Sequence, residues 1–327
     1  MKFRVLLAAI LLTGLILPIP ASAAVLNVGV AYDIGGRGDR SFNDAAAAGL
    51  IRALKEFDFN LEAVVTDGTT SDREKRVRYL ISKNCNPIIT IGSGYAPILQ
   101  MLAFEFPNVD FAIINDATVA APNVTSIVFA DTQGAYLAGF SAAQISKSGK
   151  VAMIGDTEQA DLYKNGFQAG VIASKKKVVS VVKYVSGSYS LATTQVIAAG
   201  ADVIFLTTQG SNAEVFKVIV ANNKRKKSEF TTLINVEPDQ YLTVTKETKK
   251  YLAASVVKRV DKAIFDYLKK EATGNRNSEF LVEAAGIYGY RYGITGGGIE
   301  FTIRSKDLLS KSELINAAAT YAEKIPA

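Results

Sequence analysis

Histidine and tryptophan are absent from this chain of 327 residues, and cysteine occurs once, at Cys85. A single cysteine cannot form an intrachain disulfide, even in an oxidising compartment. Without histidine, the chain lacks the commonest general base, the usual catalytic triads and the commonest metal ligand. Carboxylates alone can still support catalysis, but this composition makes an enzyme less favoured. We expect neither a metal ion nor a cofactor.

The first residues have the composition of a secretory signal peptide. Lys2 and Arg4 precede an apolar run from Val5 to Leu17, and an Ala-Ser-Ala sequence ends at Ala23. A basic start, a short apolar run and small residues at the cleavage point are typical of such a segment. The apolar run is shorter than the roughly 20 residues that a membrane span needs. We predict a signal peptide over residues 1–23, cleavage near Ala23, no lipid anchor and a periplasmic location.

Positive charge is in modest excess along the chain. The formal net charge of +6 falls to +4 when the signal segment is removed, and much of the excess lies in Lys175–Lys177 and Lys224–Lys227. Each run joins a helical pattern to a strand-like one, and no aromatic residues interleave with the lysines, so we interpret both runs as solvated loops. We expect no nucleic-acid partner and no stable membrane insertion after cleavage.

Short apolar strand-like runs alternate with helical patterns along residues 24–327. Strands are predicted over 25–31, 61–66, 87–91, 109–114, 124–129, 150–154, 178–185, 202–206, 231–235 and 254–257. Helices are predicted over 41–57, 71–83, 96–106, 132–146, 159–172, 190–199, 212–222 and 258–271. The stretch 280–303 is rich in β-formers with a tight glycine turn at 296–298, and 305–323 has the pattern of a terminal helix.

This alternation predicts an α/β protein with two doubly wound parallel-sheet lobes. We expect residues 24–129 plus 253–281 to form the N-terminal lobe and residues 130–252 plus 282–327 to form the C-terminal lobe. No proline-rich linker separates the two units, which favours lobes joined by hinge strands. Short hinges of this kind suit the closure of a cleft around a ligand.

The loop after the first strand is the first place to look for a ligand site, because ligands of open α/β sheets lie beyond the carboxyl ends of the strands. Its glycine-rich sequence, residues 33–44, permits a tight turn. Either Asp39 or Ser41 can cap the following helix, with Asp44 completing a capping-box pattern. A dinucleotide-binding loop is disfavoured because serine stands at position 41, where the last glycine of that motif belongs.

Phe42 is the aromatic residue in the first turn of that helix. Beside a polar loop at the carboxyl edge of a sheet, its ring could stack on a planar ligand. A hydrophobic staple or an ordinary core residue would have the same spacing. Spacing alone leaves both interpretations open.

Eight motifs carry a family resemblance. The segment Asp33–Asn43 resembles the D-x-G-G-x-x-D-x-S-F-N signature of the BMP/PnrA-type binding proteins, the purine-nucleoside receptors of ABC transporters. Seven further segments resemble family motifs in the same order, namely 111–115, 122–124, 136–139, 166–170, 201–205, 235–240 and 255–260. One motif would be weak evidence, but eight collinear ones over nearly the whole mature chain are strong. The resemblance implies the type I periplasmic-binding-protein fold.

The resemblance also implies roles for individual residues. Asp33 matches an aspartate that contacts the polar edge of the ligand, and Asn43 matches an asparagine beside the stacking aromatic. Phe42 matches the aromatic that stacks on the base, and Tyr189 stands where the family usually has phenylalanine on the opposite face. Tyr189 adds a hydroxyl to that pattern.

Four polar residues complete the implied ligand set. Glu237 and Asp239 match an acidic pair, and a carboxylate can accept two hydrogen bonds from a cis-diol. Lys258 matches the family lysine. Asn115 stands where an aspartate is usual, with Asp116 one position on, and Glu237 is one methylene longer than aspartate. Such changes leave the ligand class open.

Taken together, these patterns predict a periplasmic solute-binding protein of an ABC importer. We expect it to be a monomer that captures a nucleoside, with a purine favoured, and presents the closed form to a transporter permease. The same fold could instead bind a sugar or another diol-bearing solute, or act as a sensor. An enzyme that used Asp33, Glu237 and Asp239 as acid and base is a further alternative.

Overall fold

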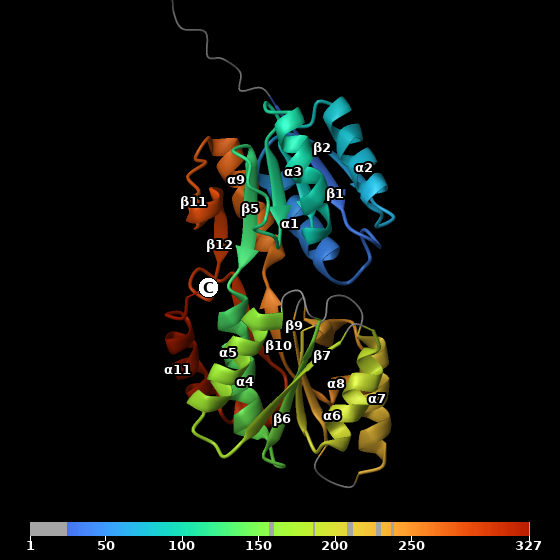
Figure 1. The fold of residues 1–327 in the computed structure, drawn as a ribbon, viewed down its shortest axis with the longest axis vertical. Coiled ribbons are helices and arrows are strands. Elements are labelled where there is room, and N and C mark those ends of the chain that lie inside the picture. Colours follow the sequence, from blue (N-terminus) through green and yellow to red (C-terminus); the bar gives the residue numbers. More distant parts are fainter. Residues whose placement is uncertain are drawn as a thin grey trace, which may run out of the picture.

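The computed structural model describes residues 25–156, 160–185, 187–207, 212–226, 230–236 and 239–326, so the predicted signal segment lies outside it. The chain folds into two α/β lobes that lie one above the other along the long axis (Figure 1). Among the described residues, no helix is both long and apolar enough to cross a bilayer.

The first lobe is built around a sheet with the strand order β11-β12-β5-β4-β3-β1-β2. Its elements are β1 (Leu26–Tyr32), α1 (Phe42–Glu56), β2 (Phe59–Val65), α2 (Thr70–Ser82), β3 (Ile88–Ile91), α3 (Ala96–Glu105), β4 (Phe111–Ile114), β5 (Val124–Phe129), α9 (Val260–Thr273), β11 (Glu279–Val282) and β12 (Ile287–Tyr292). All neighbours pair in parallel except β11 and β12, which are antiparallel.

The second lobe has a sheet with the order β13-β10-β9-β8-β6-β7. Its elements are α4 (Asp131–Ile145), β6 (Lys150–Gly155), α5 (Ala160–Ala173), β7 (Val179–Tyr184), α6 (Tyr189–Ala198), β8 (Val203–Leu206), α7 (Ala213–Lys224), β9 (Thr232–Val236), η2 (Gln240–Leu242), α8 (Lys246–Lys249), β10 (Leu252–Lys258), β13 (Ile299–Ile303), α10 (Lys306–Leu309) and α11 (Ser312–Ala322). Among its described strand pairs, β10–β13 alone is antiparallel.

The predicted alternation of strands and helices is confirmed, and most boundaries agree within one or two residues. The predicted terminal helix is divided into α10 and α11. Ser310 Oγ donates to the carbonyl oxygen of Asp307 at 2.8 Å, and such local side-chain bonds compete with continued helix.

Sheet membership places the return crossings between lobes later in the chain than the predicted boundaries at 253 and 282. Strand β10 pairs with β9 and therefore belongs to the second sheet, although residues 253–258 were expected in the first lobe. Strand β12 pairs with β5 and belongs to the first sheet, although residues from 282 on were expected in the second lobe. An apolar run predicts a strand. The neighbouring strand with which it pairs depends on contacts distant in the sequence, which local composition does not encode.

The crossings between the lobes are held to one another by hydrogen bonds. The backbone N–H of Ala130, between β5 and α4, donates to the carbonyl of Tyr292 at the end of β12, at 2.9 Å. The backbone N–H of Arg259, after β10, donates to the carbonyl of Gly298 at 2.9 Å. Gln133 Oε1 accepts from the backbone N–H of Ile294 at 3.0 Å. In the described part of the chain, the connection is therefore one bonded unit and not independent linkers.

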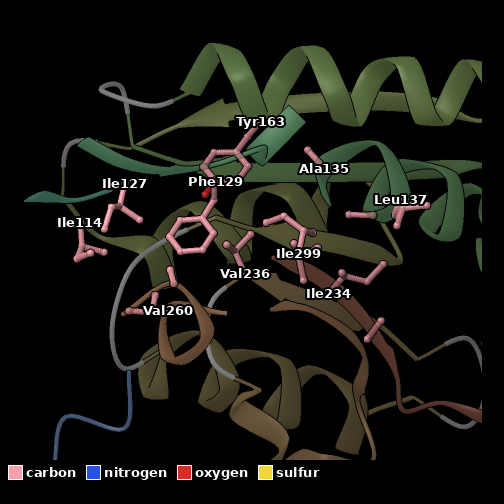
Figure 2. Packing of buried hydrophobic residues seen from close by; sticks show 14 of the residues in the cluster. Ile114, Ile127, Phe129, Ala135, Leu137, Tyr163, Ile234, Val236, Val260 and Ile299 are labelled. Carbon is pink, nitrogen blue, oxygen red and sulfur yellow. The ribbon is translucent and has the colours of Figure 1, made fainter. Parts of the chain in front are cut away.

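The largest buried apolar cluster runs through this connection and joins both sheets. Figure 2 shows Ile114, Ile127 and Phe129 of the first lobe near Tyr163 and Val236 of the second lobe. Two smaller clusters lie on the outer faces, one in each lobe. Because the main cluster spans the junction, the lobes are not separate cores on a string.

Glycines bring α4 and α5 very close together. A Cβ atom at Gly139 would lie 2.0 Å from the carbonyl oxygen of Phe167, and one at Gly170 would lie 2.0 Å from that of Tyr136. A backbone oxygen cannot yield as a flexible side chain can, so the helices would have to move apart.

Gly170→Ala is therefore expected to lower the free energy of unfolding by about 2 kcal/mol, the usual size of an overpacking effect. Urea denaturation followed by circular dichroism measures this change. Asn165→Ala on the exposed side of the same helix is the matched control and should not lower stability. An unchanged midpoint for Gly170→Ala would contradict the close contact between the helices.

Candidate functional site

The carboxyl ends of the strands of the two sheets meet at the junction of the lobes. Lys258, the last residue of β10, donates from Nζ to Asn115 Oδ1 at 3.0 Å, and Asn115 directly follows β4. A contact between the ends of strands from different sheets requires the two carboxyl edges to face each other. This is the edge at which parallel sheets bind ligands.

A buried lysine forms the centre of this junction. Lys258 is 1% exposed, and Nζ also donates to Asp131 Oδ2 at 2.9 Å, with Asp131 Oδ1 at 2.8 Å. We call Lys258, Asn115 and Asp131 the Lys258 cluster. A buried ammonium group is tolerated only when a carboxylate and further acceptors replace its water shell, and the cluster supplies both.

Local backbone chemistry explains how the cluster forms. Asn115 has a φ of +67°, a left-handed conformation that asparagine tolerates better than most residues. Asp131 lies in the first turn of α4, where the partial positive charge of the helix end favours a carboxylate. Asp116 instead accepts from the backbone N–H and hydroxyl of Thr118, so the acid at position 116 serves a local turn. Asp131 provides the carboxylate that faces the lysine.

Three aromatic rings surround the ammonium group of Lys258. Its Nζ lies 5.8 Å from the ring centroids of Phe42 and Phe129 and 5.4 Å from that of Tyr163. Phe42 and Phe129 come from the first lobe and Tyr163 from the second (Figure 2 shows Phe129 and Tyr163). The junction therefore combines a fixed cation with flat apolar faces, which suits a ligand that is both polar and planar.

Asp33 is held by its own lobe. Arg73 Nη2 donates to Asp33 Oδ1 at 2.9 Å, while Arg73 Nη1 donates to the carbonyl of Gly68. The other oxygen, Oδ2, lies over Gly92, where a Cβ atom would approach it to 3.1 Å. The side chain of Asp33 is 34% exposed, so Oδ2 can still accept a hydrogen bond from outside the lobe.

Asn43 fastens the loop that carries Asp33. Its Oδ1 accepts from the backbone N–H of Asp33 at 3.0 Å, and its Nδ2 donates to the carbonyls of Asp33 and Ile34, both at 3.3 Å. The residue is 2% exposed. The structure therefore gives Asn43 a positioning contact to Asp33.

The cap of α1 is Asp39. Its carboxylate accepts from the backbone N–H groups of Ser41, Asn43 and Asp44 at 2.8–3.1 Å. Asp44 reaches back to the N–H groups of Gly38 and Arg40. Of the two predicted capping residues, Asp39 makes the cap, and the pair of acids fixes where the helix starts and hence where Phe42 lies.

Tyr189 is the first residue of α6, which follows the carboxyl end of β7. Its ring packs against the outer cluster of the second lobe, whereas Phe42 packs against the main cluster. Burial raises the pKa of Tyr189, and the nearby charge of Asp156 raises it further. The topology thus puts Phe42 and Tyr189 on the facing edges of the two sheets.

The carboxylate of Asp239 is bonded to residues of its own lobe. Its Oδ1 accepts from Ser255 Oγ at 2.9 Å, and its Oδ2 pairs with Arg304. The side chain is 9% exposed. These bonds tie the segment after β9 to β10 and to the end of β13. The other predicted acid, Glu237, lies outside the described residues.

Among the described residues, cavities lie between the two lobes. One of about 390 Å³ is lined by Asp39 and Arg40 of the first lobe and by residues of α7, η2 and α8. The other, of about 400 Å³, lies between α1 and strands β10 and β13, and Lys258 and Asp239 line it. The second cavity therefore brings two of the predicted site residues to one space.

Sequence reasoning missed Asp131, Tyr163 and Arg73. The sequence contained a signal for Asp131, because this residue comes just after the predicted strand 124–129 and begins a helix at the carboxyl end of that strand. Arg73 had none, since its contact with Asp33 joins residues 40 positions apart. Tyr163 lies one turn inside α5, where an aromatic residue is indistinguishable from core by spacing.

Comparison with known proteins gives concordant results. The family model for PnrA-like substrate-binding proteins of ABC transporters (Bmp) matches residues 26–326. The chain is 29% identical over 311 residues to the CD4+ T-cell-stimulating antigen of Listeria innocua, covering 89% of this chain and 85% of that protein. It is 27% identical over 311 residues to the ABC transporter nucleoside-binding protein BmpA of Lactococcus lactis, covering 88% and 86% respectively.

Solved structures share the fold. A solute-binding protein of an ABC transporter system from Aeropyrum pernix superposes with a TM-score of 0.69 over 91% of this chain and 90% of that one, at 21% identity. The predicted type I architecture of two α/β lobes is thereby confirmed. Because the family model spans nearly all of the described residues, the chain belongs to the Bmp family of PnrA-like ABC transporter substrate-binding proteins.

Proposed function

We propose that this substrate-binding protein captures a nucleoside, with a purine base favoured, between its two lobes. The observation that carries the proposal is the Lys258 cluster, in which a buried cation with bonded polar groups lies among aromatic rings from both lobes. A nucleoside presents a flat apolar base and a polar ribose, and therefore matches both kinds of group. A related protein from Lactococcus lactis carries the name nucleoside-binding protein.

The aromatic residues take the base in this proposal. Phe42 and Tyr189 stack on its two faces from opposite lobes, and the half-exposed carboxylate of Asp33 accepts from its polar edge. Asn43 acts indirectly, because its amide is committed to the loop that holds Asp33. Arg73 has the same indirect role, since it holds one oxygen of Asp33 and leaves the other to the ligand.

The Lys258 cluster and the nearby acids bind the ribose in this proposal. Lys258 has a third proton beyond the two bonded to Asn115 and Asp131, and among the described residues no acceptor lies within hydrogen-bond distance of Asn115 Nδ2. Both groups can donate to ribose oxygens. Glu237 and Asp239 are the proposed acceptors of the ribose hydroxyls, with Asp239 sharing its carboxylate between the ligand and Arg304.

Ligand capture closes the lobes about the bonded crossings. A ligand that touches both lobes stabilises the closed form by its contacts that exist only there, and the transporter permease recognises that form. Export to the periplasm, signal cleavage near Ala23 and a monomeric state complete the proposal. The family comprises binding proteins of transporters, so catalysis by Asp33, Glu237 and Asp239 is set aside.

A thermal-shift screen tests the ligand class. Adenosine, guanosine and inosine are compared with ribose, free bases and a set of sugars. A true ligand at 100 times its dissociation constant should stabilise the protein by about 2.7 kcal/mol. We expect a purine nucleoside to give the largest shift. A larger shift with a sugar, or with ribose alone, would instead support a diol-binding receptor and overturn the proposed base contacts.

A further inference from the structure

The two lobes differ sharply in charge. Residues 25–129 and 259–292, which form the first lobe, contain 15 basic and 17 acidic residues. Residues 130–258 and 293–327, whose described part forms the second lobe, contain 20 basic and 14 acidic residues. The whole positive excess of the exported chain therefore belongs to one lobe.

Most of that excess gathers at one end of the second lobe. The segments that precede β6, β7, β9 and β10 and follow β13 all lie at the amino edge of the sheet, at the bottom of Figure 1 and away from the first lobe. Their exposed cations form what we call the basic face, which comprises Lys147, Lys175, Lys176, Lys177, Lys224, Arg225, Lys226, Lys246, Lys250 and Lys306.

Contacts between these segments show that they converge. Lys147, Lys246, Lys250 and Lys306, from three separate segments, line one groove of about 540 Å³. The segment of Lys177 joins the same edge, because Val179 N–H donates to the Gly149 carbonyl at 2.9 Å. The face thus runs along the sheet edge from β7 to β10, roughly 20 Å at about 4.8 Å per strand.

Among the described residues, fewer acids than cations lie at this end: Asp202 and Asp307 line the groove, and Glu247 lies beside Lys224. Asp202 is buried and accepts from Ser146 Oγ and from the backbone N–H groups of Lys147 and Ser148. Glu247 pairs with Lys224 at 3.1 Å. A surface lysine within such a group of like charges is repelled by its neighbours, so the arrangement has a cost unless an anionic partner offsets it.

Helix dipoles do not explain the pattern. Cations are favoured at helix C-termini generally, and the first lobe has the same alternation of helices and strands. Yet cations at its corresponding edge are matched by acids: Lys55, Lys83 and Lys270 lie there with Glu56, Asp58, Glu105 and Asp110. The basic face is therefore a property of one lobe and not of the fold.

We propose that the basic face binds the surface of an anionic phospholipid bilayer. A broad face of dispersed lysines suits a sheet of anionic headgroups, whereas a small anion would need one enclosed site and bidentate recognition favours arginine. Phe230, 44% exposed and 5.7 Å from the ring of Tyr251, lies on the same groove, and aromatic residues favour the membrane interface.

This placement fits the family assignment without depending on the identity of the ligand. The face lies at the opposite end of the second lobe from the junction, so docking leaves the space between the lobes accessible. Holding the receptor at the membrane raises its effective concentration near a membrane-embedded transporter.

Vesicle sedimentation with the exported chain, residues 24–327, tests the proposal. We expect binding to vesicles of phosphatidylcholine mixed with phosphatidylglycerol, little binding to phosphatidylcholine alone, and release at high salt because exposed charges are then screened. The variant Lys176→Gln/Lys177→Gln/Lys246→Gln/Lys250→Gln should bind the anionic vesicles at least about tenfold more weakly.

The matched control removes the same charge from the first lobe, as Lys55→Gln/Lys75→Gln/Lys83→Gln/Lys269→Gln, all at exposed positions. Thermal melts of both variants check that they fold. Equal weakening by the control would overturn the proposal, because net charge and not the basic face would then govern binding. Equal binding to neutral vesicles would also overturn it, as would capture by polyglutamate without binding to vesicles, which would indicate an acidic protein partner.

Discussion

Lys258→Met is expected to lower the free energy of unfolding by about 3–5 kcal/mol, the cost of leaving one member of a buried ion pair unpaired. The ammonium group is enclosed, and its loss leaves Asp131 as a buried carboxylate without its cation. Asn115 Oδ1 also loses its donor. Urea denaturation followed by circular dichroism and tyrosine fluorescence measures the change, since the chain contains no tryptophan.

The control for this experiment removes both charges. Lys258→Met/Asp131→Asn leaves neither a buried cation nor a buried anion, so it should recover most of the lost stability. If Lys258→Met had the same free energy of unfolding as the parent protein, the cluster would be more hydrated than its burial indicates. A double variant as unstable as the single one would place the loss in packing and not in charge.

The position of the cluster gives it a second consequence. Asn115 belongs to the first lobe, and Asp131 and Lys258 begin or end elements at two crossings between the lobes. A ligand that bonds to Lys258 or Asn115 therefore contacts the residues at which the lobes are joined. In the proposed mechanism, this is how occupancy of the site biases the angle between the lobes.

Element positions could be predicted because they depend on local composition. The strand Val124–Phe129 has the predicted bounds, and α1 differs from its prediction by one residue at each end. The sheet to which a strand belongs could not be predicted in this way. Strand β10 is an apolar run like its neighbours, and only its pairing with β9 and β13 shows that it belongs to the second lobe.

The prediction of the site residues has the same limit: single residues could be indicated from the sequence, but their contacts across the lobes could not. The resemblance indicated Phe42 and Lys258, and the structure brings them within 5.8 Å of each other. It did not indicate Asp131, which supplies the acid at the cluster, since the family motif carries its aspartate at position 115. Pairing across lobes depends on how two sheets face each other, and a linear motif contains no such information.

Phe42→Ala is expected to weaken nucleoside binding by about 30- to 100-fold, the usual effect of removing a ring that stacks on a base. Phe42 is the first residue of α1, and Asp39 caps this helix. Its ring is therefore held at the edge of the first sheet before the ligand binds. Isothermal titration calorimetry with the nucleoside of largest thermal shift measures the loss. Phe42→Tyr retains the stacking face and should bind within a few-fold of the parent.

Tyr189→Ala decides whether stacking comes from one lobe or from both. If the base lies between the two rings, each truncation should weaken nucleoside binding to a similar degree, and neither should change binding of ribose alone. A large loss from Phe42→Ala with none from Tyr189→Ala would place the base on the first lobe only, which would remove the aromatic contribution to lobe closure. Unchanged affinity in both variants would leave the Lys258 cluster as a binding site for a diol, since its donors act on hydroxyls without any base.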